Sequence, residues 1–360
     1  MILKIVTRPG TIRERLDRVR AILAIVLAVL GVTDTGRDEA AMRVSRQSPD
    51  PVVVEPTSVT PWTFAVLSDL HLPNDHADTV RATVAALVKL HVRFVVVTGD
   101  HTNGSDAFRG RPRTGATWWP TVREALQPLR DAGIAVFPIA GNHDSYWPWQ
   151  REAYANAFAD LDAWTAPFVV KPGRAPFYYS VDIDGVHLAM AHVVSQHLDR
   201  DVATWLEDDL AHAQFATRRI VFGHVPMMSV IRAPKAGFAA RLGAILERGR
   251  VSHYVAGHEH IVWDEQFGTV EQINVGCSSG FYQYEPSADS KMHAHCEGRP
   301  NTMHCSMPDG GGAFVIAKGR KNRRVQHAKN SFTLFTVDGD AVRVQPMTIV
   351  DGQPRPFYLD

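Results

Sequence analysis

The sequence is poor in cysteine and has no excess of charge of either sign. Its three cysteines are Cys277, Cys296 and Cys305, and no pair has the Cys-x-x-Cys spacing of a structural zinc ribbon. Lys+Arg and Asp+Glu both number 38, so the formal net charge is zero. A general nucleic-acid surface requires a basic excess, so this composition argues against one.

Long hydrophobic runs are scarce as well. The apolar run from Ala21 to Val32 is shorter than the ~20 residues that a membrane-spanning helix needs. It follows a basic segment, and this order is typical of a secretory signal. We therefore expect residues 1–32 to be a signal or membrane-anchor segment of a periplasmic or secreted protein. The alternative is an amphipathic helix of a cytoplasmic protein. Residues 33–60 are polar, contain prolines and are predicted to be a linker.

Histidine, by contrast, is abundant. The chain has 17 histidines, many of them in short clusters, which indicates metal binding or proton transfer. Hydrophobic residues make up 45% and charged residues 21%, an ordinary balance for a globular protein with a sizeable core. Nothing in the sequence indicates the oligomeric state.

Apolar strand patterns alternate with helical periodicity from residue 61 onward, which predicts an α/β domain over residues 61–350. Late hairpins with Asp-Gly turns add antiparallel strands, so the sheets are expected to be mixed. Residues 287–330 are predicted to be a loop insertion before a C-terminal hairpin. The predicted strands are 63–67, 94–97, 134–140, 177–183, 186–190, 219–222, 253–256, 270–275, 331–336 and 341–347, and the predicted helices are 78–90, 122–132, 150–158, 204–213 and 239–247.

Polar residues suited to metal binding follow five of these strands directly. The organising example is Gly141-Asn142-His143-Asp144, which ends an apolar run. Ligands of open α/β sheets bind beyond the carboxyl ends of strands, so residues far apart in the chain are expected to meet there. The predicted metal ligands are Asp69, His71, Asp100, Asn142, His224, His258 and His260.

These ligands offer oxygen and imidazole donors without thiolate, a mixture that suits Zn, Mn or Fe. Seven ligands are too many for one ion with open positions. They suit two ions that share a bridging carboxylate, an arrangement that can hold a hydroxide and clamp a phosphoryl group.

From about residue 61 to residue 280, this constellation resembles the calcineurin-like metallophosphoesterase superfamily, with all five motifs in the family's order. The resemblance implies a four-layer αββα sandwich of two mixed sheets flanked by helices. It implies that Asp69, His71 and His260 hold the first metal, that Asn142, His224 and His258 hold the second, and that Asp100 bridges both. The resemblance also implies that His143 is the catalytic histidine and that it contacts the oxygen of the leaving group.

Two details bear on the branch of the superfamily. Residues 205–207 and 257–260 look most like the purple-acid-phosphatase-like branch. That branch places a tyrosine ligand where this chain has Asn103, so a ferric-tyrosinate centre is not expected. Many relatives have Glu where this chain has Asp144. Its carboxylate is predicted to orient His143, as carboxylates orient metal-site imidazoles, and the alternative is a solvated turn residue.

Other polar residues are expected to lie outside the ligand set. His101, His192 and His197 could line the cleft, and Arg109, Arg111 and Arg113 belong to a loop that is more simply explained as solvated. Cys296 and Cys305 could form a disulfide or remain free thiols. The loop residues His293, His295, Cys296, His304 and Cys305 could bind a further metal, but their irregular spacing favours a disordered loop or a disulfide.

The function predicted from these residues is hydrolysis of phosphate esters by direct attack of a metal-bridging hydroxide, with His143 protonating the leaving group. A phosphomonoesterase is favoured. The alternative is a phosphodiesterase acting on cyclic nucleotides, phospholipid head groups or nucleic acid. A binding scaffold without catalysis would lack ligands, and none is missing here.

Overall fold

The computed structural model describes residues 60–74, 76–104, 117–228, 236–280, 313–315, 324–326 and 330–356. The predicted signal segment, Arg109 and its neighbouring arginines, and the loop residues 293–305 lie outside these ranges. The described residues belong to the compact unit Pro56–Asp360. None of the helices described is both long and apolar enough to cross a bilayer.

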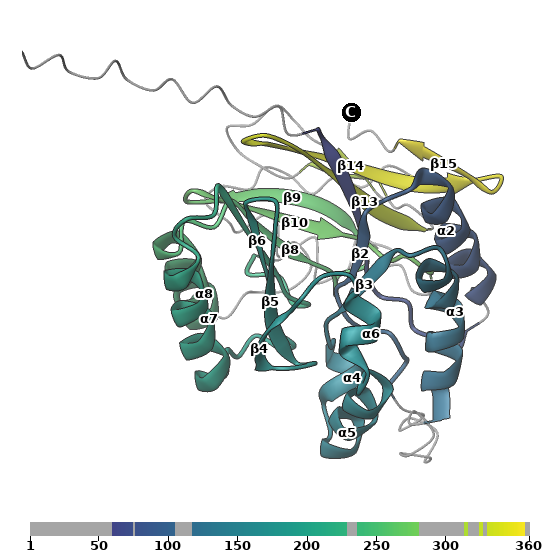
Figure 1. Ribbon diagram of the computed structural model, residues 1–360, viewed down its shortest axis with the longest axis horizontal. Helices are drawn as coiled ribbons and strands as arrows, with labels where there is room; N and C mark the ends of the chain where they lie inside the picture. The colour runs from purple at the N-terminus through teal and green to yellow at the C-terminus, as the bar shows by residue number, and fades with distance from the viewer. Residues whose placement is uncertain are drawn as a thin grey trace, which may run out of the picture. The chain divides into compact units, whose positions relative to one another are not determined.

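Two mixed β-sheets form the centre of this unit (Figure 1). The first sheet has the strand order β15 (Gln353–Pro356), β14 (Ala341–Val350), β13 (Ser331–Asp338), β1 (Trp62–Leu67), β2 (Phe94–Val97) and β3 (Ala135–Pro138). The second sheet has the order β4 (Lys171–Arg174), β5 (Tyr178–Ile183), β6 (Val186–Met190), β7 (Arg218–Phe222), β8 (His253–Ala256), β10 (Val270–Val275) and β9 (Val262–Phe267).

Helices cover the outer faces of the two sheets (Figure 1). Beside the first sheet lie α2 (Ala77–Leu90), α3 (Trp119–Asp131), α4 (Asn142–Ser145), α5 (Pro148–Ala157) and α6 (Leu161–Thr165). Beside the second lie α7 (Arg200–His212) and α8 (Ala236–Arg248).

Three hydrophobic cores separate the resulting four layers, and β1 shows how one strand serves two of them. Phe64 and Val66 point into the core between the sheets, whereas Ala65 and Leu67 point into the core beneath α2 and α3. Successive side chains of a strand face opposite sides, so a strand buried on both faces must be apolar throughout. A third core packs α7 and α8 on the second sheet. The predicted αββα sandwich is confirmed.

The predicted strands and helices are present with small shifts of their ends, and several further elements were not predicted. These are α4, α6, β4, β9 and β15, the last lying beyond residue 350. Within residues 287–330, predicted to be a loop, β11 (Ala313–Val315) pairs with β12 (Arg324–Gln326). Strand β4 is exposed along its whole length and contains Pro172 and Gly173, so it has neither the alternation nor the apolar run that identifies a strand.

A buried histidine joins the second sheet to its helix layer. His187 of β6 lies between two carboxylates: Nδ1 is 2.7 Å from Asp182 Oδ1 and Nε2 is 2.8 Å from Asp209 Oδ2. Burial lowers the pKa of His187, but the hydrogen bonds and charges of Asp209 and Asp182 outweigh it and raise the pKa above its ordinary value. The imidazolium can donate to both carboxylates at once.

We predict that His187→Ala lowers the free energy of unfolding by about 1–3 kcal/mol near pH 6, because two hydrogen bonds to charged groups are lost. The pKa of His187 is higher in the folded protein than in the unfolded protein. The stabilisation is therefore complete below about pH 6.5, the pKa in the unfolded protein, and declines as pH rises through the pKa in the folded protein. Urea unfolding of both proteins from pH 5.5 to 9 measures the difference. The exposed His212→Ala on α7 is the control, and a difference that grows with pH would contradict the prediction.

Candidate metal centre

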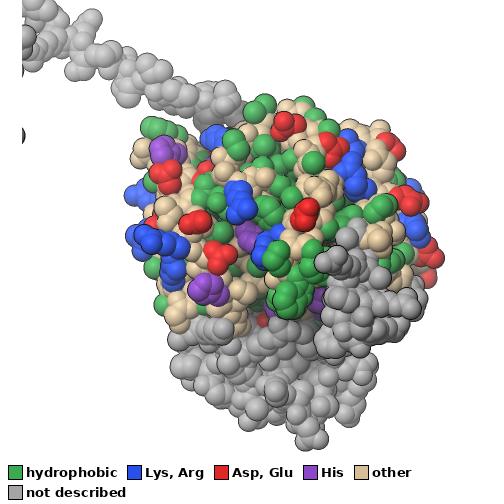
Figure 2. All heavy atoms as spheres, turned by 90° about the horizontal axis from the view of Figure 1, so that it is seen from below, with side chains coloured by type: hydrophobic (Ala, Val, Ile, Leu, Met, Phe, Trp, Pro, Cys, Tyr) green, Lys and Arg blue, Asp and Glu red, His purple; other side chains and the backbone are tan. Residues whose placement is uncertain are grey.

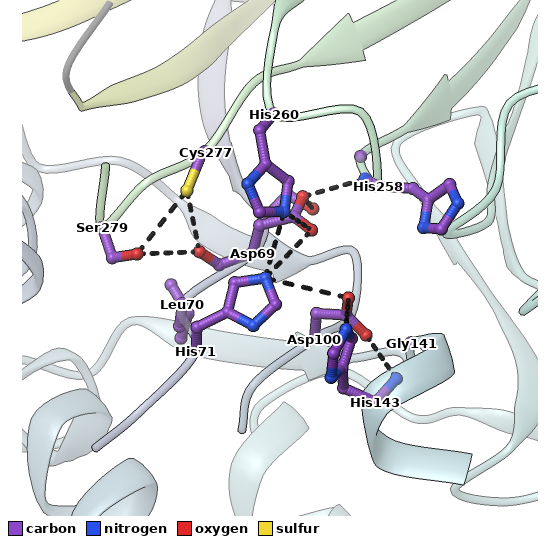
Figure 3. A network of polar contacts seen from close by, with 12 residues as sticks. Asp69, Leu70, His71, Asp100, Gly141, His143, His258, His260, Cys277 and Ser279 are labelled. Carbon is purple, nitrogen blue, oxygen red and sulfur yellow. Dashed lines mark hydrogen bonds and ion pairs between the residues drawn. The ribbon is translucent and has the colours of Figure 1, made fainter. Parts of the chain in front are cut away.

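The predicted ligands lie where parallel strands of both sheets end (Figure 3). Asp69 and His71 follow β1, Asp100 follows β2 and Asn142 follows β3. From the second sheet, His224 follows β7, and His258 and His260 follow β8. The two sheets face each other, so their strand ends bring residues from positions 69 to 260 to one place.

The backbone at these positions is unusual. Asp69, His71, Asp100, His258 and His260 all have positive φ, between 48° and 70°. Residues other than glycine rarely adopt this left-handed conformation, and such strained positions cluster at functional sites. The backbone therefore bends at the strand ends so that these side chains point into the site. The packing of a hydrophobic core would not require such a bend.

Two glycines let the strand ends approach closely. A Cβ at Gly141 would overlap the backbone nitrogen and carboxylate of Asp100, and a Cβ at Gly257 would overlap the hydroxyl of Ser68 and the carboxylate of Asp69. A larger residue at either position would push apart the strands that carry the ligands.

Three side chains form a first group of possible ligands. Asp69 Oδ1 lies 3.2 Å from His260 Nε2 and 3.7 Å from His71 Nε2, and the two imidazole nitrogens are 3.1 Å apart. These are the residues that the sequence assigned to the first metal.

A second group lies beside it. Asp100 Oδ2 is 3.2 Å from His224 Nε2, which in turn is 3.2 Å from His258 Nδ1 and 2.9 Å from Asn142 Oδ1. These are the residues that the sequence assigned to the second metal.

Asp100 stands between the two groups. Its Oδ2 faces His224 on one side and His71, at 3.8 Å, on the other. Its Oδ1 accepts a hydrogen bond of 2.8 Å from the backbone N–H of His143, which holds the carboxylate in place. A carboxylate shared by two groups of imidazoles has the position that a bridging ligand requires.

The donor set fits a pair of cations. Asp69 Oδ1 is fully buried and accepts no well-directed hydrogen bond from the described part of the chain, although imidazole nitrogens surround it. Burying a carboxylate in this way is costly unless a positive charge compensates it. Oxygen and imidazole donors without thiolate suit Mn, Fe or Zn.

Electrostatics within the site show how strongly these groups interact. Burial raises the pKa of Asp69, but nearby histidines, above all His260, hold that pKa well below its usual range. Burial also raises the pKa of Asp100, but nearby histidines, above all His224, hold that pKa well below its usual range. Burial lowers the pKa of His224, but Asp100 outweighs it and raises the pKa to about 9. In the absence of metal, protons on imidazoles balance the carboxylates.

Comparison with known proteins places the chain in a family. The model of the calcineurin-like phosphoesterase family matches residues 63–262, more than half of the sequence. The chain belongs to this family. Its members are metal-dependent phosphoester hydrolases with a dinuclear centre, and the clustered Asp and His side chains fit such a centre.

Solved structures share the fold at low sequence identity. A purple acid phosphatase from yellow lupin (Lupinus luteus) seeds is 12% identical with a TM-score of 0.55, and the match covers 82% of this chain and 53% of the lupin chain. A dimetal phosphatase from Danio rerio is 13% identical with a TM-score of 0.53, and the match covers 83% of this chain and 99% of that one. The sequence gives no match among curated proteins.

His143 of this phosphoesterase lies at the edge of the ligand groups. Its Nδ1 is 2.9 Å from the carbonyl oxygen of Asn103, and its Nε2 is 3.9 Å from Asp100 Oδ2. The side chain is 40% exposed, whereas that of the neighbouring Asp100 is buried. A carbonyl acceptor keeps the proton on Nδ1 and leaves Nε2 directed toward the site.

The prediction that the Asp144 carboxylate orients His143 directly is wrong, because this carboxylate forms its hydrogen bonds with other residues. The buried Asp144 carboxylate accepts hydrogen bonds from the backbone and ring of His101, from the backbone and hydroxyl of Thr102, and from the backbone of Gly141. Asp144 therefore fastens the loop after β2 to the loop after β3. None of these contacts is to His143 itself, and the loop after β2 presents the Asn103 carbonyl to His143.

The other predicted cleft histidines lie elsewhere. His101 is fully buried among the rings of Trp119, Tyr154 and Phe158, so it cannot touch a substrate phosphate. His192 lines a separate cavity, and His197 is exposed beside Asp199.

The residues that support Asp69 were not predicted from the sequence. The Ser68 hydroxyl and the His258 N–H donate to Asp69 Oδ2, at 2.6 and 2.9 Å. Cys277 and Ser279 donate to the Asp69 backbone carbonyl (Figure 3). The signal was available, because strand β10 also ends in a glycine followed by polar residues, Cys277-Ser278-Ser279.

We predict that metal binding to this phosphoesterase releases protons and tightens as pH rises. The pKa of His224 is raised to about 9, so at pH 7 a metal must displace its proton. Affinity should therefore rise up to about pH 9 and level off above it. Calorimetric titration of metal-free protein with Mn²⁺, in two buffers of different ionisation enthalpy, counts the protons. Equal affinity at pH 6.5 and pH 9 would contradict the assignment.

Proposed function

We propose that this chain hydrolyses phosphate monoesters at a centre that holds two metal ions. The observation that carries the proposal is the position of Asp100 between the two ligand groups, 3.2 Å from His224 and 3.8 Å from His71, with the half-exposed His143 beside them. Metal ions bound in such a pair neutralise phosphoryl oxygens and acidify water.

The charge of the ligand set favours a monoester. Asp69 and Asp100 are the only carboxylates among the predicted ligands, and the remaining ligands are neutral when they bind metal. Two divalent ions would outweigh these two negative charges by two positive ones, and a bridging hydroxide would reduce that excess to one. The centre would stay positive, so it would attract a dianionic monoester more strongly than a diester with one negative charge.

The side chains of this chain have distinct tasks in the reaction. Asp100 is held by the His143 N–H and fixes the spacing of the two groups. Asp69, fixed by Ser68 and the His258 backbone, orients the first group. His143, with Nδ1–H on the Asn103 carbonyl, directs Nε2 toward the site, where the imidazolium form would give its Nε2 proton to the leaving oxygen.

We predict that His143→Ala lowers kcat by about 10²–10⁴-fold on an alkyl phosphate, because the departing alkoxide loses its proton donor. Metal content should stay at two ions per chain, since His143 is outside the predicted ligand set. Turnover and elemental analysis of the same preparation measure both. The exposed His197→Ala is the control, and loss of metal together with activity would make His143 a ligand instead.

The preference for monoesters has a direct test. Wild-type protein should hydrolyse p-nitrophenyl phosphate with a higher kcat/KM than bis-p-nitrophenyl phosphate, because the positive centre attracts the dianion more strongly. Both reactions release the same chromophore under the same conditions. The reverse order would identify a phosphodiesterase.

A further inference from the structure

A polar cavity is lined in part by segments that adjoin the predicted metal ligands. It has a volume of about 460 Å³ and is lined by residues of α4, α5, β4, β5, the segment after β6 and the first turn of α7. Arg151, Arg174, Arg200 and His192 are the basic residues in its wall. On the face of the unit seen from below, basic side chains gather around a histidine (Figure 2).

Two walls of the cavity are continuous with the site. Ser145, in one wall, belongs to the single-turn helix α4 that begins with Asn142 and His143, and its hydroxyl donates to the carbonyl of Gly141 at 2.9 Å. His192 and Val194, in the other wall, flank Val193, whose carbonyl accepts from the N–H of His224 at 3.1 Å. Ser145 in the cavity wall therefore lies two residues after His143, about 3 Å further along the helix axis.

The arginines give the cavity a positive character. Arg151 donates to the carbonyl of Ser145 at 2.7 Å, which holds its side chain against α4. Arg174 lies 5.4 Å from the centre of the Phe177 ring. Within the described ranges, no carboxylate forms an ion pair with Arg151, Arg174 or Arg200. Asp199 and Asp201 also line the cavity, so three arginines face two carboxylates.

His192 adds a polar atom without a partner. Its Nε2 is buried and has no hydrogen-bond partner among the described residues. Burial lowers the pKa of His192 to about 4; Asp199 opposes the shift, and Arg151 and Arg174 add to it. The ring is thus neutral at pH 7, and both guanidinium groups lie near enough to influence it. A buried polar atom left unsatisfied is costly, so a ligand that bonds to it would be favoured.

We propose that this cavity binds an anionic oxygen group, a carboxylate or a second phosphate, carried by the leaving group of the substrate. The assignment rests on the proposed phosphoesterase function. His143 meets the leaving oxygen, and the helix that begins at Asn142 ends in the cavity wall, so the leaving group extends from the metal centre toward Arg174 and His192. Phe177 and Tyr178 supply an apolar surface for the atoms between the two charged groups.

The test compares substrates that differ only in the far end of the leaving group: phenyl phosphate, 4-carboxyphenyl phosphate and 1,4-phenylene bisphosphate. The measured quantity is the kcat/KM of each charged substrate divided by that of phenyl phosphate. Because every substrate meets the same protein, the ratio does not depend on the folded fraction. We expect Arg174→Gln to lower the larger of the two ratios about tenfold, because the charged substrate loses one hydrogen bond to the guanidinium group.

Two further variants make the test specific. Arg174→Lys keeps the charge and should restore part of the ratio, and Arg343→Gln, which removes an exposed arginine from β14, should leave it unchanged. The substrate with the larger wild-type ratio identifies the anionic group as carboxylate or phosphate.

The possible failures are distinguishable. If wild-type protein hydrolyses none of the three substrates, the phosphoesterase proposal fails and this assignment fails with it. A second failure is that phenyl phosphate is hydrolysed but neither kcat/KM ratio differs between the wild type and the variants Arg174→Gln and Arg200→Gln. That result would overturn the assignment of the cavity and leave the phosphoesterase proposal standing.

Discussion

The Asp100 carboxylate, placed between two groups of imidazole nitrogens, is the interaction on which the rest of this structure depends. It is buried, its pKa is lowered by the surrounding histidines, and it reaches His224 on one side and His71 on the other. Concentrating buried carboxylates and imidazoles in this way is unfavourable without compensating charge. The site is therefore built for cations, and the sandwich holds the groups together until they bind.

The fold provides that rigidity through its strand ends. Ligand residues adopt left-handed backbone conformations, and glycines at 141 and 257 allow neighbouring loops to touch. The Asp144 carboxylate then ties the loop after β2 to the loop after β3. Such strain persists only where surrounding structure over-determines it, and here three hydrophobic cores anchor both sheets behind the site.

The architecture and the composition of the site could be read from the sequence because each ligand follows an apolar run. Strands buried on both faces, such as Phe94–Val97, give a clear signal, and the polar residue after the strand marks its carboxyl end. Asp144 was assigned the wrong contact because most of the hydrogen bonds that it accepts come from His101 and Thr102, 43 and 42 positions earlier in the chain, and sequence spacing contains no such information. Strand β4 was missed because its pairing with β5, rather than its composition, makes it a strand.

Anomalous diffraction from crystals grown with Mn²⁺ can show whether this chain holds two metal ions around Asp100. We expect two anomalous peaks about 3.5–4 Å apart, with Asp100 Oδ2 between them. One peak should be bounded by Asp69, His71 and His260, and the other by Asn142, His224 and His258. A single peak, or two peaks that do not share Asp100, would contradict this expectation.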